Sequence, residues 1–97
     1  MINFNLNNRV AIVTGGAQGF GYAITERFIN SGAKVIIWDI DENEAKKTLE
    51  KISSKELSYQ IVDVSNFETI NKSLLETEKK FGKIDIFINN AGMAGLN

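Results

Sequence analysis

Residues 14–21 read Thr-Gly-Gly-Ala-Gln-Gly-Phe-Gly and join an apolar run to a segment with helical spacing. The run before them, residues 10–13, is short, continuous and rich in β-branched side chains, as in a strand buried on both faces. After the glycines, apolar residues recur every four positions, at Phe20, Ile24 and Phe28. Gly32 stands where such a helix would end. This stretch therefore predicts a strand, a glycine turn and a helix.

The same pattern of a strand followed by a helix occurs twice more, and a fourth strand signal follows. Apolar runs at residues 35–38, 57–62 and 84–88 predict further strands. Two polar segments between them each carry one apolar helical face, formed by Ala45, Leu49 and Ile52 in the first and by Phe67, Ile70, Leu74 and Phe81 in the second. The strand aromatics Trp38 and Phe87 are expected in the core.

Short motifs predict where the second and third helices begin. Asp41 with Glu44, and Ser65 with Glu68, have the spacing of a capping box, in which a side chain bonds the backbone N–H three residues later. Gly82 is expected to end the third helix.

Four strand signals separated by three helix signals predict an α/β fold. The expected architecture is a Rossmann-type doubly wound parallel sheet with right-handed crossovers and strand order 3-2-1-4. Such a sheet ordinarily continues to the order 3-2-1-4-5-6, and a fourth strand without an outer neighbour would leave backbone groups unpaired. We therefore expect residues 1–97 to be the N-terminal dinucleotide-binding half of a larger domain, truncated at Asn97.

The composition argues against several classes of function. Eleven basic and twelve acidic residues give a net charge of −1, with no basic patch for nucleic acid or for a membrane. Cysteine and histidine are absent, which excludes a thiolate or imidazole metal site and a histidine-based catalytic triad. The sequence shows no secretion signal and only strand-sized apolar runs, so a cytoplasmic location is expected.

The glycine turn has the position and the residue types of a nucleotide-binding loop. Gly15 lets the chain turn off the strand, Gly19 removes a side chain that would block a diphosphate, and Gly21 permits close helix packing. The free N–H groups and the positive end of the helix dipole would then face the anion. Because the glycines lie between a strand and a helix, nucleotide binding is favoured over a simple tight turn.

An acidic residue ends the second predicted strand. Asp39 lies close to the ~20-residue offset at which an acid meets the adenosine ribose in such folds. Its carboxylate can accept from both ribose hydroxyls and would repel a 2′-phosphate. Gln18 and Ile40 are uncharged and offer that phosphate no cation. The sequence therefore predicts NAD rather than NADP, the alternative for Asp39 being a solvated carboxylate at a strand end.

Together these residues resemble the short-chain dehydrogenases/reductases, the SDR family, whose glycine motif is Thr-Gly-x-x-x-Gly-x-Gly. Asp39, Asp63-Val64 and Asn89-Asn90-Ala91-Gly92 match further family motifs at the ends of successive strands. The resemblance covers essentially all 97 residues and is strongest to NAD-preferring 3-oxoacyl-carrier-protein reductases and to sugar or polyol dehydrogenases. It implies an enzyme that interconverts a secondary alcohol and a ketone by hydride transfer with NAD, and a homo-oligomer at full length.

The resemblance also implies roles for single residues. Asp63 would accept from the adenine amino group and the Val64 N–H would donate to the ring, unless Asp63 only starts a turn. The backbone of residues 90–92 would run beside the adenosine ribose, Thr14 would fasten the glycine turn to the fourth-strand loop, and Asn89 would tie neighbouring strands. The expected cofactor-binding residues are Thr14, Gly15, Gln18, Gly19, Phe20, Gly21, Asp39, Ile40, Asp63, Val64, Asn90, Ala91 and Gly92.

The catalytic residues that the resemblance implies are a serine and a Tyr-x-x-x-Lys segment. The two tyrosines are Tyr22 and Tyr59, and the residues four positions later are Glu26 and Asp63. We therefore expect no catalytic residue in this chain and no turnover by it alone. Two alternatives are a non-catalytic nucleotide-binding module and a fragment of an S-adenosylmethionine-dependent methyltransferase, although Thr14 and the segment after the fourth strand weigh against the methyltransferase.

Overall fold

Strands and helices alternate along the chain in the computed structural model, which describes residues 5–90. The elements are β1 (Val10–Thr14), α1 (Gly19–Asn30), β2 (Lys34–Asp39), α2 (Glu42–Ile52), β3 (Leu57–Ile61), α3 (Phe67–Phe81) and β4 (Ile86–Asn89). The strands are parallel and form one sheet of order β3-β2-β1-β4. This confirms the predicted Rossmann-type topology. No helix within residues 5–90 is both long enough and apolar enough to cross a membrane.

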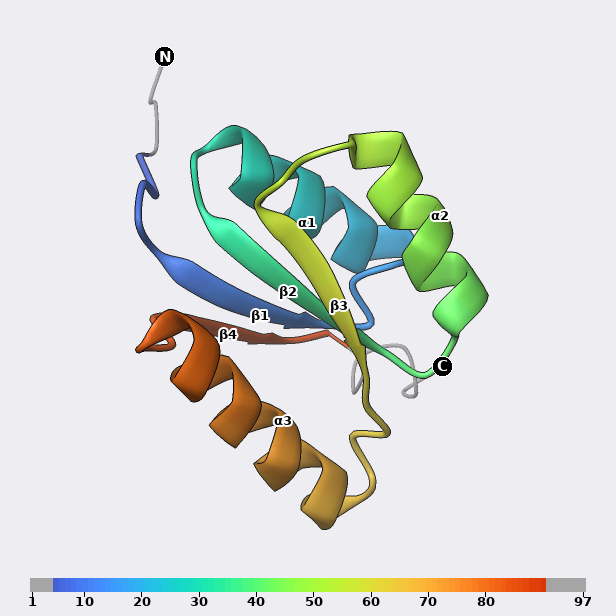
Figure 1. The fold of residues 1–97 in the computed structure, drawn as a ribbon. Coiled ribbons are helices and arrows are strands. Elements are labelled where there is room, and N and C mark those ends of the chain that lie inside the picture. The colour runs from blue at the N-terminus through green and yellow to red at the C-terminus, as the bar shows by residue number, and fades with distance from the viewer. Residues whose placement is uncertain (1–4, 91–97) are drawn as a thin grey trace.

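The sheet carries helices on both faces, with α1 and α2 on one side and α3 on the other (Figure 1). A hydrophobic core lies on each face of the sheet, and alternate side chains of β1 and β2 contribute to the two cores. Ala11, Val13, Val35 and Ile37 pack under α1 and α2, whereas Val10, Ile12, Ile36 and Trp38 pack against α3. Full burial of such an aliphatic side chain contributes roughly 1.5–3 kcal/mol, so these two strands are the main source of stability.

The capping residue predicted from the sequence is confirmed for α2 but not for α3. Asp41 precedes α2 and its carboxylate accepts from the Glu44 N–H at 3.1 Å, as predicted. The prediction for α3 was wrong, because its first turn is capped by Asn66, which accepts from the backbone N–H groups of Glu68 and Thr69. The Ser65 hydroxyl instead donates to Asp63 at 2.6 Å.

Three aromatic residues expected on apolar faces are not covered in the described chain. Phe20 and Phe67 lie in the first turns of α1 and α3 and are 77% and 73% exposed, because these turns begin at the rim of the sheet. Phe87 is half-exposed since β4 is an edge strand, although its ring still meets Trp38 edge to face at 5.4 Å. The core prediction is confirmed for Trp38, which is fully buried.

Candidate functional site

Three parts of the chain meet at the carboxyl edge of the sheet. Parallel strands carry their carboxyl ends to one edge, so the turn after β1 lies beside the ends of β2 and β4. Asp39 at the end of β2 accepts from the Ala17 N–H, and Asn90 after β4 donates to the Gly15 carbonyl. The residues that the sequence singled out on separate strands are therefore brought together around the glycine turn.

The start of α1 is built differently from the starts of α2 and α3. Gln18 precedes α1 in an extended conformation, with no side-chain bond to the first turn and no acidic residue within that turn. Asp41 and Asn66 cap the other two helices. The first N–H groups of a helix have no partner inside the helix and carry its positive dipole end. The amino end of α1 can therefore accept an anion without displacing a capping side chain.

Two glycines shape this turn by adopting positive φ angles. Gly15 has a φ of 61° and Gly19 a φ of 53°, in the left-handed region that favours glycine. A Cβ added at Gly19 would meet no atom within 4 Å among the described residues. Space therefore lies open beside the amino end of α1, where the sequence placed a diphosphate.

Gly21 permits a close approach of α1, but its main neighbour is the turn rather than the sheet. A Cβ there would collide with the Gly15 carbonyl oxygen and would lie 2.8 Å from Asn90 Nδ2. Gly16, to which the sequence assigned no separate role, also needs its small size, since a Cβ would lie 2.9 Å from Ile37 Cγ2 and 3.0 Å from the Val13 carbonyl oxygen. The turn is thus pressed between the sheet and the first turn of α1.

Asp39 is a buried carboxylate, only 8% exposed, and not a solvated one. One oxygen accepts from the Ala17 N–H at 3.4 Å and the other from the Asp41 N–H at 3.0 Å. Each carboxylate oxygen can accept more than one hydrogen bond, so both retain capacity for a ligand hydroxyl. Ile40 follows Asp39 in the chain and Gln18 follows Ala17; both side chains are exposed and carry no charge.

The predicted link between the glycine turn and the fourth strand is confirmed. The Thr14 hydroxyl lies 3.3 Å from both the Ile88 carbonyl oxygen and Asn89 Oδ1, which joins β1 to β4. Asn90 is 8% exposed and its side chain reaches the Gly15 carbonyl at 3.4 Å. Ala91 and Gly92, the other two residues expected beside the ribose, lie outside the described residues.

The segment after β3 forms a turn at the same edge. Asp63 accepts from both the N–H and the hydroxyl of Ser65, at 2.9 and 2.6 Å, and these bonds lower the pKa of its carboxyl. This arrangement fits the turn interpretation of Asp63, and contact with adenine stays a prediction. Val64 is 37% exposed and therefore accessible to a ligand.

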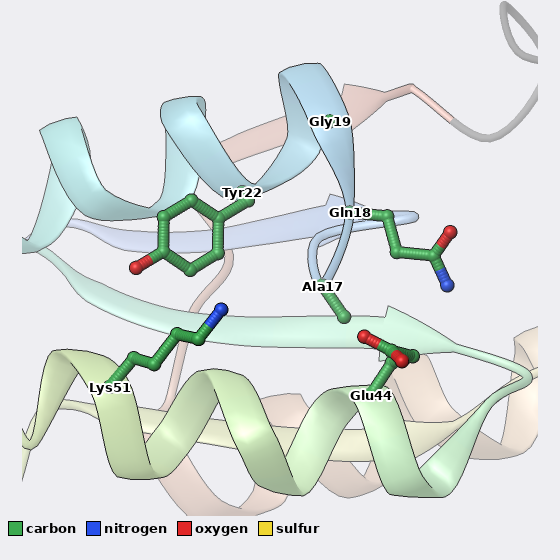
Figure 2. Close-up of a pocket in the computed structure, with 6 residues that line it drawn as sticks. All are labelled: Ala17, Gln18, Gly19, Tyr22, Glu44 and Lys51. Carbon is green, nitrogen blue, oxygen red and sulfur yellow. The ribbon is translucent and has the colours of Figure 1, made fainter.

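A groove of about 380 Å³ runs from the glycine turn between α1 and α2. Its lining consists of Ala17, Gln18, Gly19, Tyr22, Glu44 and Lys51. Figure 2 shows the Lys51 ammonium directed toward the Tyr22 ring, whose centroid is 5.7 Å away. The groove thus has the glycine turn at one end and a cation beside an aromatic ring at the other.

The surroundings of Tyr59 do not suit an acid/base role. Its hydroxyl donates to a Glu42 carboxylate oxygen at 2.9 Å, and this bond raises the pKa of the phenol. The residue four positions after Tyr59 is Asp63 and not the lysine of the Tyr-x-x-x-Lys segment that the family resemblance implies.

Comparisons with known proteins agree with this geometry. The family model for short chain dehydrogenase matches residues 9–97. A 3-oxoacyl-[acyl-carrier-protein] reductase of Chlamydia muridarum is 37% identical, the match covering 95% of this chain and 38% of that protein. An NAD-dependent glycerol dehydrogenase of Listeria innocua is 40% identical, over 97% of this chain and 37% of that protein.

Two solved structures show the same arrangement of elements. A short chain dehydrogenase from Bacillus anthracis superposes with a TM-score of 0.84 at 32% identity, covering 88% of this chain and 35% of that one. A 3-ketoacyl-(acyl-carrier-protein) reductase from Brucella melitensis complexed with NADH gives a TM-score of 0.79 at 32% identity, covering 86% and 34%. The chain therefore spans somewhat more than a third of the length of the curated relatives described above.

Proposed function

The chain belongs to the short-chain dehydrogenase family, and we propose that its function is to bind NAD(H) for an oxidoreductase that interconverts a secondary alcohol and a ketone. The family match overturns the methyltransferase alternative. Two similar proteins support a nicotinamide cofactor, since one is named as NAD-dependent and the other was solved with NADH.

The residues of the site fit such a dinucleotide. The uncapped amino end of α1 and the open space at Gly19 suit a diphosphate. Asp39 would accept from the adenosine ribose, while Asp63 and Val64 would contact adenine. When bound, the cofactor supplies or accepts the hydride.

One observation carries the preference for NAD over NADP. The Asp39 carboxylate is buried and held against the glycine turn by the Ala17 N–H, so its negative charge cannot swing away from a ligand there. A 2′-phosphate beside it would meet a fixed like charge, which is strongly unfavourable at a desolvated site.

Proton transfer is not assigned to residues 1–97. Residues 1–97 contain no Tyr-x-x-x-Lys segment, and neither Tyr22 nor Tyr59 is followed by a lysine four positions later. We therefore expect cofactor binding but no measurable hydride transfer from these 97 residues alone. A non-catalytic nucleotide-binding module would bind NADH equally well, and turnover of an alcohol by the protein at its natural length separates the two cases.

Titration with NADH and NADPH, followed through the fluorescence of the only tryptophan, Trp38, tests the proposal. NADH should bind more tightly, and Asp39→Asn, which removes the charge but keeps the shape, should reduce the preference by about 10- to 100-fold, or about 1.4–2.8 kcal/mol. Tighter binding of NADPH by the unaltered protein would contradict the role of Asp39. Failure to bind either dinucleotide would contradict the proposed function.

A further inference from the structure

Three successive carbonyls of the glycine turn accept hydrogen bonds from buried side chains in three separate parts of the chain: helix α1, helix α2 and the residue after β4. Asn90 Nδ2 reaches the Gly15 carbonyl, and two threonine hydroxyls reach the next two carbonyls. The threonines are Thr25 on α1, 3.3 Å from the Gly16 oxygen, and Thr48 on α2, 3.3 Å from the Ala17 oxygen.

We propose that Thr25 and Thr48 are positioning residues for the dinucleotide, because they hold the turn in the shape that presents its N–H groups and Asp39 to the cofactor. This inference rests on the proposed function. It adds two residues that no motif of the sequence singled out, and the role given to them is to act through the backbone of the turn.

Thr25 fixes one peptide unit of the turn together with Asp39. The carbonyl and the N–H of a trans peptide point in opposite directions. Thr25 binds the carbonyl of the Gly16–Ala17 peptide and Asp39 binds its N–H, so the plane of this peptide is held from both sides. Loss of the Thr25 bond would let this peptide rotate. The rotation would also move the Asp39 carboxylate, because Asp39 bonds the N–H of the same peptide.

Thr48 links α2 to the same turn. Its hydroxyl lies 3.0 Å from the Glu44 carbonyl oxygen, the usual partner one helical turn back, and also within reach of the Ala17 oxygen. The start of α2 is bound to Asp39 through the Asp41 N–H. The helix is thus attached to the ribose-binding carboxylate at one point and to the glycine turn at another.

Burial requires both hydroxyls to be bonded: Thr25 bonds the Gly16 carbonyl of the turn, and Thr48 has the Glu44 carbonyl as a second acceptor beside Ala17. Thr25 is fully buried and Thr48 is 2% exposed, and a buried hydroxyl is unfavourable unless it is bonded. Valine has the same shape and would pack at both positions without a hydrogen bond. The hydroxyl is therefore the feature to test, separately from the volume.

Thr77 offers a matched control on the opposite face of the sheet. It is also 2% exposed, and its hydroxyl bonds the carbonyl one helical turn back, that of Ser73, at 2.8 Å. Its second neighbour is Gln60 Oε1 at 3.4 Å and not the glycine turn. Thr77→Val thus removes a comparable buried hydroxyl from α3.

The experiment compares NADH dissociation constants and thermal unfolding for variants of the protein at its natural length. Thr25→Val and Thr48→Val should each raise the Kd about 5- to 10-fold, the range expected for one lost hydrogen bond. Thr25→Ser and Thr48→Ser keep the hydroxyl and should bind NADH like the unaltered protein. Thr77→Val should lower the thermal midpoint and leave the Kd unchanged.

Three results decide the matter. If the valine variants bind NADH as tightly as the unaltered protein, or if Thr77→Val weakens binding as much as they do, the positioning role is overturned. If the unaltered protein itself does not bind NADH, the proposed function fails instead. Should one valine variant not fold, the valine variant at the other threonine, compared with its serine variant, gives the test.

Discussion

Gly21 lies so close to the backbone of the glycine turn that a side chain at this position would overlap with it. The Cβ of Gly21→Ala would collide with the Gly15 carbonyl oxygen and press on Asn90. We expect the variant to lose about 1–3 kcal/mol of unfolding free energy, the usual cost of overpacking, because the turn or α1 must move. The same movement should weaken NADH binding by about tenfold or more. Urea unfolding and calorimetric titration measure the two effects.

Gly82 provides the comparison for a glycine outside the site. It ends α3 with a φ of 83°, and a Cβ there would meet no atom within 4 Å in residues 5–90. Gly82→Ala should therefore cost about 1–2 kcal/mol of stability through its left-handed backbone alone and leave NADH affinity unchanged. Unchanged NADH binding by Gly21→Ala would contradict the described packing of the turn.

The sequence predicted site residues whose side chains have a recognisable chemical role or belong to a known motif. It did not predict residues that shape the site through contacts with the backbone of the glycine turn. Asp39 and Thr14 stood out as an acid at a strand end and as part of a motif. Gly16, Thr25 and Thr48 did not, because their neighbours are a strand side chain and backbone carbonyls that carry no sequence signature.

At the level of the helices, the cap of α3 gives a test that separates two adjacent residues. Asn66→Ala removes the acceptor for two backbone N–H groups and should cost about 1 kcal/mol of stability. Ser65→Ala should cost less than about 0.5 kcal/mol, since Ser65 is exposed and its hydroxyl bonds Asp63 in the preceding turn. A larger loss for Ser65→Ala in urea unfolding would favour the capping box that the sequence suggested.

The sequence could not distinguish these two caps because both residue types suit the position. Ser65 and Asn66 each precede Glu68 at a spacing compatible with capping. In the structure the Ser65 hydroxyl donates to the Asp63 carboxylate, and Asn66 caps the start of α3. The strands were easier to predict, since a continuous apolar run such as residues 35–38 fits a strand buried on both faces.

Over the whole molecule, a carboxylate that titrates in acid adds a side-chain bond between β1 and the residue before β4. Asp85 accepts from the Val10 N–H at 2.9 Å and lies near Lys83 and Arg9. The Val10 bond, then Lys83 and Arg9, lower the pKa of the Asp85 carboxyl. The folded pKa thus lies below the unfolded value of about 3.9, so the stabilisation is present above that pH and is lost as the pH falls through the folded value.

Asp85→Asn should therefore reduce the urea midpoint at neutral pH and flatten its fall below about pH 4. Asp63 also has a lowered pKa and should retain part of the acid dependence in this variant. An acid profile of Asp85→Asn identical in shape to that of the unaltered protein would contradict the role given to Asp85.

The strand order was predictable from the alternating patterns because right-handed crossovers leave few arrangements for four parallel strands. Exposure at the rim was not predictable in the same way. Phe20 and Phe67 continue the apolar spacing of their helices beyond the point where the sheet covers them, and only the three-dimensional structure shows where that cover ends.

The most direct test of the nucleotide-binding role is a crystal structure of the protein with NADH. We expect the diphosphate within hydrogen-bond distance of the N–H groups at the start of α1, and the adenosine ribose hydroxyls bonded to the Asp39 carboxylate. A dinucleotide bound elsewhere, or bound in this site with its ribose away from Asp39, would contradict the proposed function.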